Sequence, residues 1–347
     1  MPSTLHYPDI PIPIPGKTRE SVAEGVYWLR FPLPFALDHI NLWLLDEGDA
    51  WTLVDTGIGL GNIRALWQEA FQNCLEGRPL GRIIVTHYHP DHIGQAAWLS
   101  EQFRVPVFMT AGESATAARI HQASSQEFGQ RLAGLFSAHG LDGQRAGRLA
   151  TQGNRYRQLV PDIPATTVPI QDGQMLTIGG REWRVMVGHG HSPEHAALYC
   201  RQLQVLISGD QVLPAITTNI SVGPADPLGD PLAAYLASLA TLAELPPSVR
   251  VLPSHGLVFE GLQARIEQLQ AHHRERLQAL QRACHEPRSA ADVLDLLFAR
   301  ALDNHQLMFA MGEAIAHLHR LDAAGTIARI RDSGDGIIRF QQPARAV

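Results

Sequence analysis

Thr86-His87-Tyr88-His89-Pro90-Asp91-His92-Ile93-Gly94 is the stretch that decides the fold. It follows the apolar run 83–85 and precedes a helical pattern over 95–102, which predicts that a strand ends here in a tight turn. Imidazole and carboxylate groups are the ligands of zinc, iron and manganese sites. Alternation places His87 and His89 on one side, while Asp91 and His92 can point to a second centre. These four ligand-type residues favour a metal site over a histidine-rich surface loop.

The composition is that of an ordinary globular protein, with 347 residues, 45% hydrophobic and 18% charged. The net charge of -6 offers no general attraction to nucleic acid or to an anionic membrane. Three widely spaced cysteines indicate no disulfide framework. The proline-rich residues 1–16 lack the pattern of a signal peptide, and no run approaches the roughly 20 apolar residues of a membrane span. We therefore expect a soluble, cytoplasmic protein with no membrane partner.

The order of the patterns predicts three parts. We expect an extended N-terminal arm over 1–20, a catalytic domain over 21–260 and a helical C-terminal domain over 261–347. The helical pattern at about 111–157 is too long for a connecting loop, so it predicts a helical insertion within the catalytic domain. Its arginines form either a solvated face or an anion-binding rim; they are Arg119, Arg131, Arg145, Arg148, Arg155 and Arg157.

The catalytic domain starts as an antiparallel meander and continues as alternating strands and helices. Residues 25–30, 40–45 and 51–54 have strand patterns, and a helix over about 62–75 precedes the strand at 82–86. This order predicts an α/β fold built on a mixed sheet. In five places an apolar strand ends and an Asp or His follows within a few residues, in four of them with a glycine one or two residues away. Ligands of α/β proteins gather at that edge of the sheet, and the residues concerned are Asp55, His87, His191, Asp210 and His255.

These motifs resemble those of the metallo-β-lactamase-fold hydrolases, in the same order and at similar spacing over residues 20–260. The resemblance implies a four-layer αββα sandwich with two divalent metal ions at one edge, zinc first, with iron or manganese as alternatives. It implies that His87, His89 and His191 hold the first ion. It implies further that Asp91, His92 and His255 hold the second, that Asp210 bridges the two, and that Asp55 lies behind the site and orients ligands.

Two divalent ions about 3.5–4 Å apart share a water molecule and lower its pKa toward neutrality. The resulting bridging hydroxide would attack a carbonyl or phosphoryl centre, with Asp91 as a proton acceptor and Asp210 as the bridge. Asp91 and Asp210 are therefore the predicted catalytic residues.

Four further residues near the motifs have less specific signals. His195 matches a histidine that supports the ligands in similar sequences, and His189 is expected to be a neighbour rather than a ligand. His39 lies in a loop that approaches the metals from the substrate side in similar sequences, and a surface turn is the alternative. Tyr88 is either a donor to a substrate oxygen or a packed aromatic residue.

The C-terminal residues predict three helices, at 261–283, about 290–302 and about 305–321, and a β-hairpin up to residue 340. Ser289 and Asp292 have the spacing of a capping box for the second helix. This order of elements resembles a winged helix. It is similar to the C-terminal domain of the subfamily that includes β-lactamase-like protein 2.

Two classes of function are compatible with this sequence. The first is a dinuclear metal-dependent hydrolase of a small-molecule thioester or ester, as in glyoxalase II-type enzymes. The alternative is a phosphodiesterase or endoribonuclease with the same two-metal site, which the likeness of the C-terminal domain favours. The acidic balance and the apolar third helix favour a small-molecule substrate and no specific nucleic-acid partner. A non-catalytic role fits the seven predicted ligands poorly because structural zinc sites usually have only four protein ligands. The sequence leaves open whether the protein is a homo-oligomer.

Overall fold

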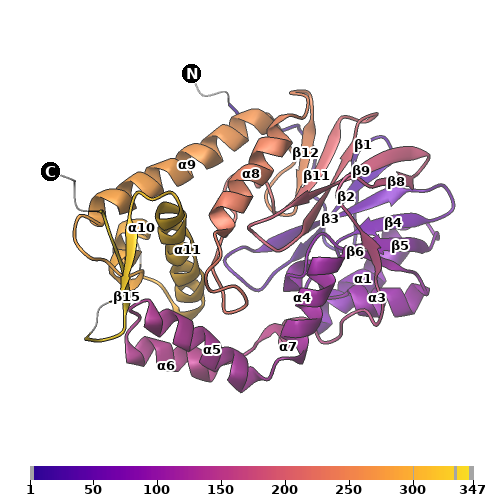
Figure 1. The fold of residues 1–347 in the computed structure, drawn as a ribbon. Helices are drawn as coiled ribbons and strands as arrows, with labels where there is room; N and C mark the ends of the chain where they lie inside the picture. The colour runs from indigo at the N-terminus through magenta and orange to yellow at the C-terminus, as the bar shows by residue number, and fades with distance from the viewer. Residues whose placement is uncertain (1–3, 300, 332–333, 344–347) are drawn as a thin grey trace. The chain divides into compact units, whose positions relative to one another are not determined.

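The computed structural model describes residues 4–299, 301–331 and 334–343. The chain forms two compact units, each assembled from separated segments (Figure 1). The first unit contains Met1–Gln122, Tyr156–Thr218 and Ser238–Ile266. The second contains Ala123–Arg155, Asn219–Ala237 and Glu267–Val347. The expected boundaries at residues 20 and 260, and the insertion at 111–157, stay a proposal about domain organisation.

The first sheet of unit 1 has seven strands in sequence order. The predicted meander forms its antiparallel part, β1 to β4, and the later strands join in parallel. The strands are β1 Glu20–Ala23, β2 Val26–Pro32, β3 His39–Asp46, β4 Trp51–Val54, β5 Leu80–Ile84, β6 Val107–Thr110 and β7 Val168–Ile170.

The second sheet has six strands in the order β13-β12-β11-β10-β9-β8, antiparallel except for the parallel pair β11 and β12. Its strands are β8 Met175–Ile178, β9 Arg181–Gly188, β10 His195–Cys200, β11 Val205–Gly209, β12 Arg250–Pro253 and β13 Phe259–Glu260. The N-terminal arm adds an isolated bridge from His6 to Glu260 at the edge.

Two apolar cores hold unit 1 together. Between the sheets, Trp28 and Trp43 of the first sheet pack in one cluster with Trp183 of the second. On the other face of the first sheet, Trp67 of α1 (Gly61–Asn73) and Leu99 of α3 (Ala96–Phe103) bury against strand residues. The side chains of these residues alternate along each strand, so one face packs on the other sheet and one on helices. The predicted α/β fold with two sheets and helices is confirmed.

Helices and one hairpin make up the second unit, around a core of their own. The predicted hairpin forms as β14 and β15, and the third predicted helix forms as α11. The elements are α5 Ser125–Ala138, α6 Gly143–Gln152, η1 Ala291–Val293, α10 Leu294–Leu297, α11 Asn304–Ala323, β14 Ala328–Arg331 and β15 Ile338–Gln341; α8 Pro231–Ala243 and α9 Leu262–Ala283 have residues in both units.

The helix expected over about 290–302 is shorter than predicted. Ser289 and Asp292 do exchange the expected capping hydrogen bonds. However, the helix ends at Leu297, where the backbone carbonyl accepts a hydrogen bond from Arg276, and Phe298 is extended. The guanidinium group of Arg276 also lies 5.0 Å from the Phe298 ring centre. Arg276 belongs to another helix, so nothing in the local sequence indicates its contacts at the end of this element.

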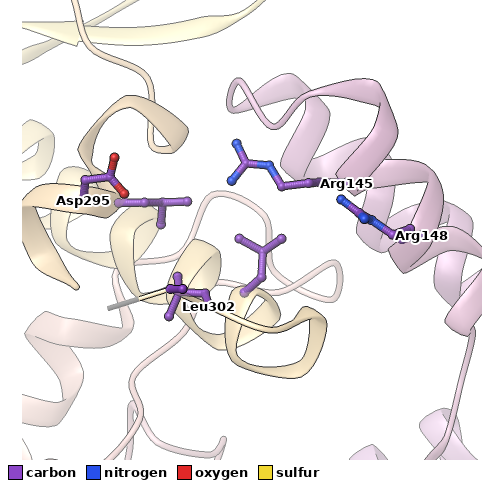
Figure 2. Close-up of a pocket in the computed structure, with 7 residues that line it drawn as sticks. Arg145, Arg148, Asp295 and Leu302 are labelled. Atoms are coloured by element: carbon purple, nitrogen blue, oxygen red, sulfur yellow. The ribbon is translucent and has the colours of Figure 1, made fainter. Parts of the chain in front are cut away.

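A cavity of about 330 Å³ lies within the second unit. Arg145 and Arg148 of α6 line it together with Asp295 and apolar side chains (Figure 2). Asp142 already pairs with Arg145 at 2.5 Å. The two arginines and the two aspartates therefore balance in charge.

Within the described part of the chain, no helix combines the length and apolarity that crossing a membrane requires.

Candidate metal centre

The histidine and aspartate side chains singled out in the sequence gather at one edge of unit 1. They come from both sheets and follow the ends of five different strands, as the sequence pattern predicts. Asp55 follows β4, His87 follows β5, His191 follows β9, Asp210 follows β11 and His255 follows β12. Seven of the residues form two groups whose potential ligand atoms lie within 4.8 Å of one another in each group.

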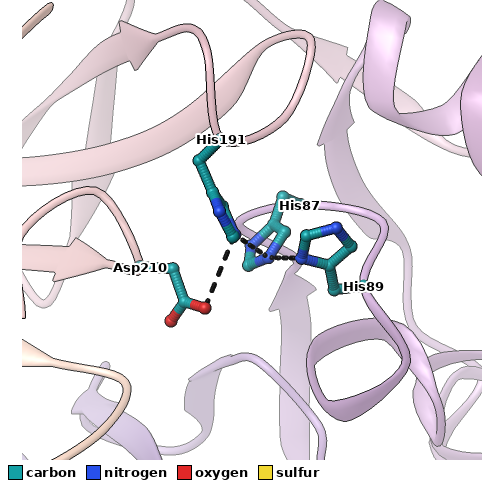
Figure 3. Close-up of side chains that lie close together, drawn as sticks. All are labelled: His87, His89, His191 and Asp210. Carbon is teal, nitrogen blue, oxygen red and sulfur yellow. Dashed lines mark hydrogen bonds and ion pairs between the residues drawn. The ribbon is translucent and has the colours of Figure 1, made fainter. Parts of the chain in front are cut away.

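The first group contains three imidazoles and one carboxylate (Figure 3). Nε2 of His87 lies 2.9 Å from Nδ1 of His89 and 3.2 Å from Nε2 of His191. Nε2 of His191 lies 3.5 Å from Oδ2 of Asp210. Atoms about 2.0–2.2 Å from a tetrahedral ion lie about 3.3–3.6 Å apart. The first group therefore has nearly the spacing of a tetrahedral ligand set.

The second group contains Asp91, His92 and His255. Oδ2 of Asp91 lies 3.6 Å from Nε2 of His92 and 3.4 Å from Nε2 of His255. Oδ1 of Asp210 lies 3.6 Å and 3.3 Å from the same two nitrogens. Asp210 thus directs one carboxylate oxygen to each group, the arrangement that a bridging ligand requires.

Unsatisfied polar atoms test whether this site fits metal ions. Nε2 of His92, Nε2 of His255 and Oδ1 of Asp210 are buried, and none has a hydrogen-bond partner among the described residues. Buried polar atoms without partners are rare and point to a missing ion or water. These three atoms converge on one point, so the donor set fits a divalent cation.

Hydrogen bonds at the outer nitrogens fix the orientation of the rings. Nδ1 of His92 donates to Oδ2 of Asp55 at 2.7 Å, and Nδ1 of His255 donates to the backbone carbonyl of His39 at 2.7 Å. The Thr86 hydroxyl donates to Asp55 and lies 3.0 Å from Nδ1 of His87. With Nδ1 engaged as a donor, Nε2 keeps its lone pair for a cation.

The backbone of Asp55 is in the left-handed region, with φ of 60°. This conformation is uncommon outside glycine, and Asp tolerates it better than most residues. It directs the carboxylate toward the amide and hydroxyl of Thr86, at 2.8–3.0 Å. Sequence reasoning missed Thr86, although its position directly before His87 was a signal.

His195 contacts the backbone of Asp210 rather than joining either group. Its Nε2 accepts a hydrogen bond from the Asp210 amide at 3.1 Å. Gly209 makes this approach possible, because a Cβ there would lie 2.3 Å from Nε2 of His195. The geometry supports the expectation that His195 positions a ligand.

The histidine pKa values shift in opposite directions in the two groups. Burial, together with the neighbouring imidazoles, lowers the pKa of His87 and of His89 well below the usual value for histidine. Burial also opposes a positive charge on His92, but Asp55, Asp91 and Asp210 outweigh it and raise the pKa of His92. The second group therefore favours positive charge, which a cation would supply.

Three other expected residues take part in loop contacts. His39 uses both ring nitrogens, with Asp38 at 2.6 Å and the Gly256 amide at 2.8 Å. Tyr88 packs its ring 4.6 Å from His89 and accepts a hydrogen bond at its carbonyl from the Tyr156 hydroxyl. His189 lies 2.5 Å from the Pro193 carbonyl and joins neither group. The substrate-side roles of His39 and Tyr88 stay predictions.

Two family models match the chain. Residues 36–255 match the metallo-beta-lactamase superfamily, and residues 277–343 match the metallo-beta-lactamase-like C-terminal domain. The second match confirms the predicted likeness of the C-terminal region to a subfamily with such a domain.

Similar curated proteins include thioesterases. The acyl-coenzyme A thioesterase MBLAC2 of Homo sapiens is 26% identical over 56% of this chain and 65% of its own length. Lactamase-like protein vrtG of Penicillium aethiopicum is 28% identical over 69% of this chain and 58% of its own. Atrochrysone carboxyl ACP thioesterase of Aspergillus fumigatus is 23% identical over 75% and 66%. The chain thus spans about three fifths to two thirds of these relatives.

Two solved structures match nearly the whole chain. A beta-lactamase domain protein from Burkholderia ambifaria has a TM-score of 0.91 and 45% identity, covering 98% of both chains. A metallo-beta-lactamase family protein from Thermus thermophilus has a TM-score of 0.76 and 28% identity, covering 93% of this chain and 100% of its own. With its two sheets, its paired His and Asp groups and these matches, the chain belongs to the metallo-beta-lactamase superfamily.

Proposed function

We propose that this hydrolase is a dinuclear metal-dependent enzyme that cleaves a small-molecule thioester or a related ester. The observation that carries the proposal is Asp210, whose two oxygens face the nitrogens of two separate ligand groups. Similarity to acyl-coenzyme A and acyl carrier protein thioesterases supports the thioester class. Zinc is the first expectation for the metal because imidazole nitrogen dominates the donor set.

Two divalent ions held in these groups would acidify water and polarise the carbonyl oxygen of the substrate. The side chains have separate tasks in this proposal. Asp91 is partly exposed, and its Oδ2 lies beside His92 and His255, so it can accept a proton from an attacking water molecule. Asp210 holds the spacing between the groups, and Asp55 and Thr86 keep the rings in the orientation that binding needs.

Apolar side chains near His255 favour an acyl substrate. Leu257, two residues after His255, is 38% exposed, and Ile216, two residues after Pro214, is 46% exposed. These two loops meet at Gly256, whose amide donates to His39 and where a Cβ would lie 2.6 Å from Pro214. An exposed apolar surface beside a reactive centre suits the hydrocarbon part of a thioester better than a polyanion.

A substrate panel tests the proposal. Zinc-loaded protein would be assayed on acyl-coenzyme A thioesters of increasing chain length, the matching oxygen esters, a bis-aryl phosphate and single-stranded RNA. We expect the highest kcat/KM on a thioester, and a further rise with chain length. Leu257→Ser should reduce that rise and leave the short-chain rate nearly unchanged.

Two controls separate site chemistry from contamination. The Asp210→Ala variant should lose every activity. The His285→Ala variant, which changes an exposed histidine, should retain full activity. Faster turnover of RNA or of the phosphodiester than of every thioester would instead support the nuclease or phosphodiesterase alternative.

A further inference from the structure

We propose that Glu113 is a positioning residue that holds together the two loops supplying the first metal group. Glu113 lies in the first turn of α4 (Ala111–Gln122), and its side chain is fully buried. Neither the sequence motifs nor the two ligand groups include it. The inference rests on the metal-binding part of the proposed function.

Each carboxylate oxygen of Glu113 binds a different ligand loop. Oε2 accepts the backbone amide of Tyr88 at 2.9 Å. Oε1 accepts the Ser192 hydroxyl at 2.5 Å and the backbone amide of Glu194 at 2.7 Å. Tyr88 lies between His87 and His89, and Ser192 directly follows His191. One carboxylate therefore connects the sources of all three imidazoles in the first group.

A second set of contacts makes the connection reciprocal. The Glu194 carboxylate accepts the Gly112 amide at 2.6 Å, and the Glu194 carbonyl accepts the Thr110 hydroxyl at 2.8 Å. Gly112 permits this contact, because a Cβ there would lie 2.6 Å from the Glu194 side chain. The start of α4 and the loop at 192–194 are thus fixed to each other on both sides.

Burying the Glu113 carboxylate is unfavourable, so its presence at this position calls for a structural reason. Among the described residues, no arginine, lysine or histidine forms an ion pair with it, and hydrogen bonds alone satisfy it. Burying a carboxylate without a cation is strongly unfavourable until such bonds offset the lost hydration. An apolar side chain could fill the space, but it could not fix two loops in register.

The second metal group has different supports. His92 is oriented by Asp55, and His255 by the His39 carbonyl. None of these contacts involves Glu113. Loss of the carboxylate should therefore loosen the nitrogens of His87, His89 and His191 and leave the second group nearly unchanged. A general loss of stability would weaken both groups together.

Cobalt titration of the metal-free protein, followed by visible absorption and by chelator competition, tests this selectivity. A His255→Ala background reports on the first group, and a His89→Ala background reports on the second. Glu113→Gln keeps the shape, but its single amide oxygen cannot accept hydrogen bonds from both loops. We expect the cobalt Kd of the first group to rise at least about tenfold, and that of the second to change less than about threefold.

Matched variants make the result decisive. Glu313→Gln removes a partly buried carboxylate, one that pairs with Arg276 in the second unit, and should leave both Kd values unchanged. Ser192→Ala removes a single donor and should weaken only the first group, so it decides the question alone if Glu113→Gln does not fold. Equal loss in both groups, or none in either, would overturn the role of Glu113. Failure of the parent protein to bind cobalt would instead refute the proposed function.

Discussion

The backbone amide of Asp210 donates to Nε2 of His195 at 3.1 Å, so this histidine has used its inward nitrogen on the main chain. His191, four residues earlier, directs its Nε2 to the carboxylate of the same aspartate at 3.5 Å. Two histidines of one motif therefore have different relations to Asp210. One faces its side chain and the other holds its backbone.

This difference predicts different outcomes for two alanine variants. His191→Ala should lose the ion of the first group, because a direct ligand is gone. His195→Ala should retain close to two equivalents of metal but lose about 10–100-fold in activity, since Asp210 is less well placed. Elemental analysis and turnover on the best thioester would measure both. Equal metal loss in the two variants would mean that His195 is a ligand.

Metal removal should destabilise the protein. The nitrogens of His92 and His255 and an oxygen of Asp210 are buried without hydrogen-bond partners among the described residues. An ion that binds only the folded state adds about 2.7 kcal/mol at 100 times its Kd. Thermal unfolding with and without chelator should show a lower Tm in the metal-free protein, reversed by zinc. Asp210→Ala should show a much smaller difference, and an equal one would contradict the assignment.

Acid should destabilise the protein through three histidines of the second unit that belong to neither ligand group. Burial, with nearby positive groups, lowers the pKa of His139 to about 4, of His273 to about 3 and of His317 to about 4. The unfolded chain takes up these protons near pH 6.5, so stability is present above that pH and is lost as pH falls toward 4. Each histidine contributes about 1.4 kcal/mol per pH unit in this window.

His139→Phe isolates one of these contributions. The His139 ring stacks on Phe340 at 6.3 Å, so a phenylalanine can keep that packing without titrating. Denaturant unfolding of metal-free protein between pH 6 and 5 should show a slope reduced by up to about 1.4 kcal/mol per pH unit in the variant. Parallel curves for the two proteins would show that His139 is not buried as a neutral ring.

The C-terminal region should not bind nucleic acid specifically. A winged helix inserts an exposed polar helix into a groove, but most of α11 is buried, including Met311 and Ile315. Its Glu313 and Arg320 already pair with Arg276 and Asp230. Fluorescence anisotropy at about 0.15 M salt should detect no sub-micromolar RNA or DNA binding. Tight binding that is lost with Arg329→Ala and Arg339→Ala would reverse this prediction.

The site could be predicted from the sequence where ligand-type residues follow strands that are recognisable from their alternation. The ligand-type residues stand at strand ends, and strands are readable from alternation, so the gathering of His87, His191 and His255 could be predicted. Contacts between distant segments could not. Glu113 looks like any glutamate in a helix, and only the fold brings it to Tyr88 and Ser192. Likewise, Arg276, which contacts the end of α10, lies in another helix.

Because the two groups take ligand-type residues from both sheets, the proposed ions cannot be fully coordinated early in synthesis. The first group needs Asp210 and the second needs His255, so neither can be complete on a ribosome that has made only the first sheet. In the proposed function, metal loading is therefore completed late in biogenesis, once both sheets have formed.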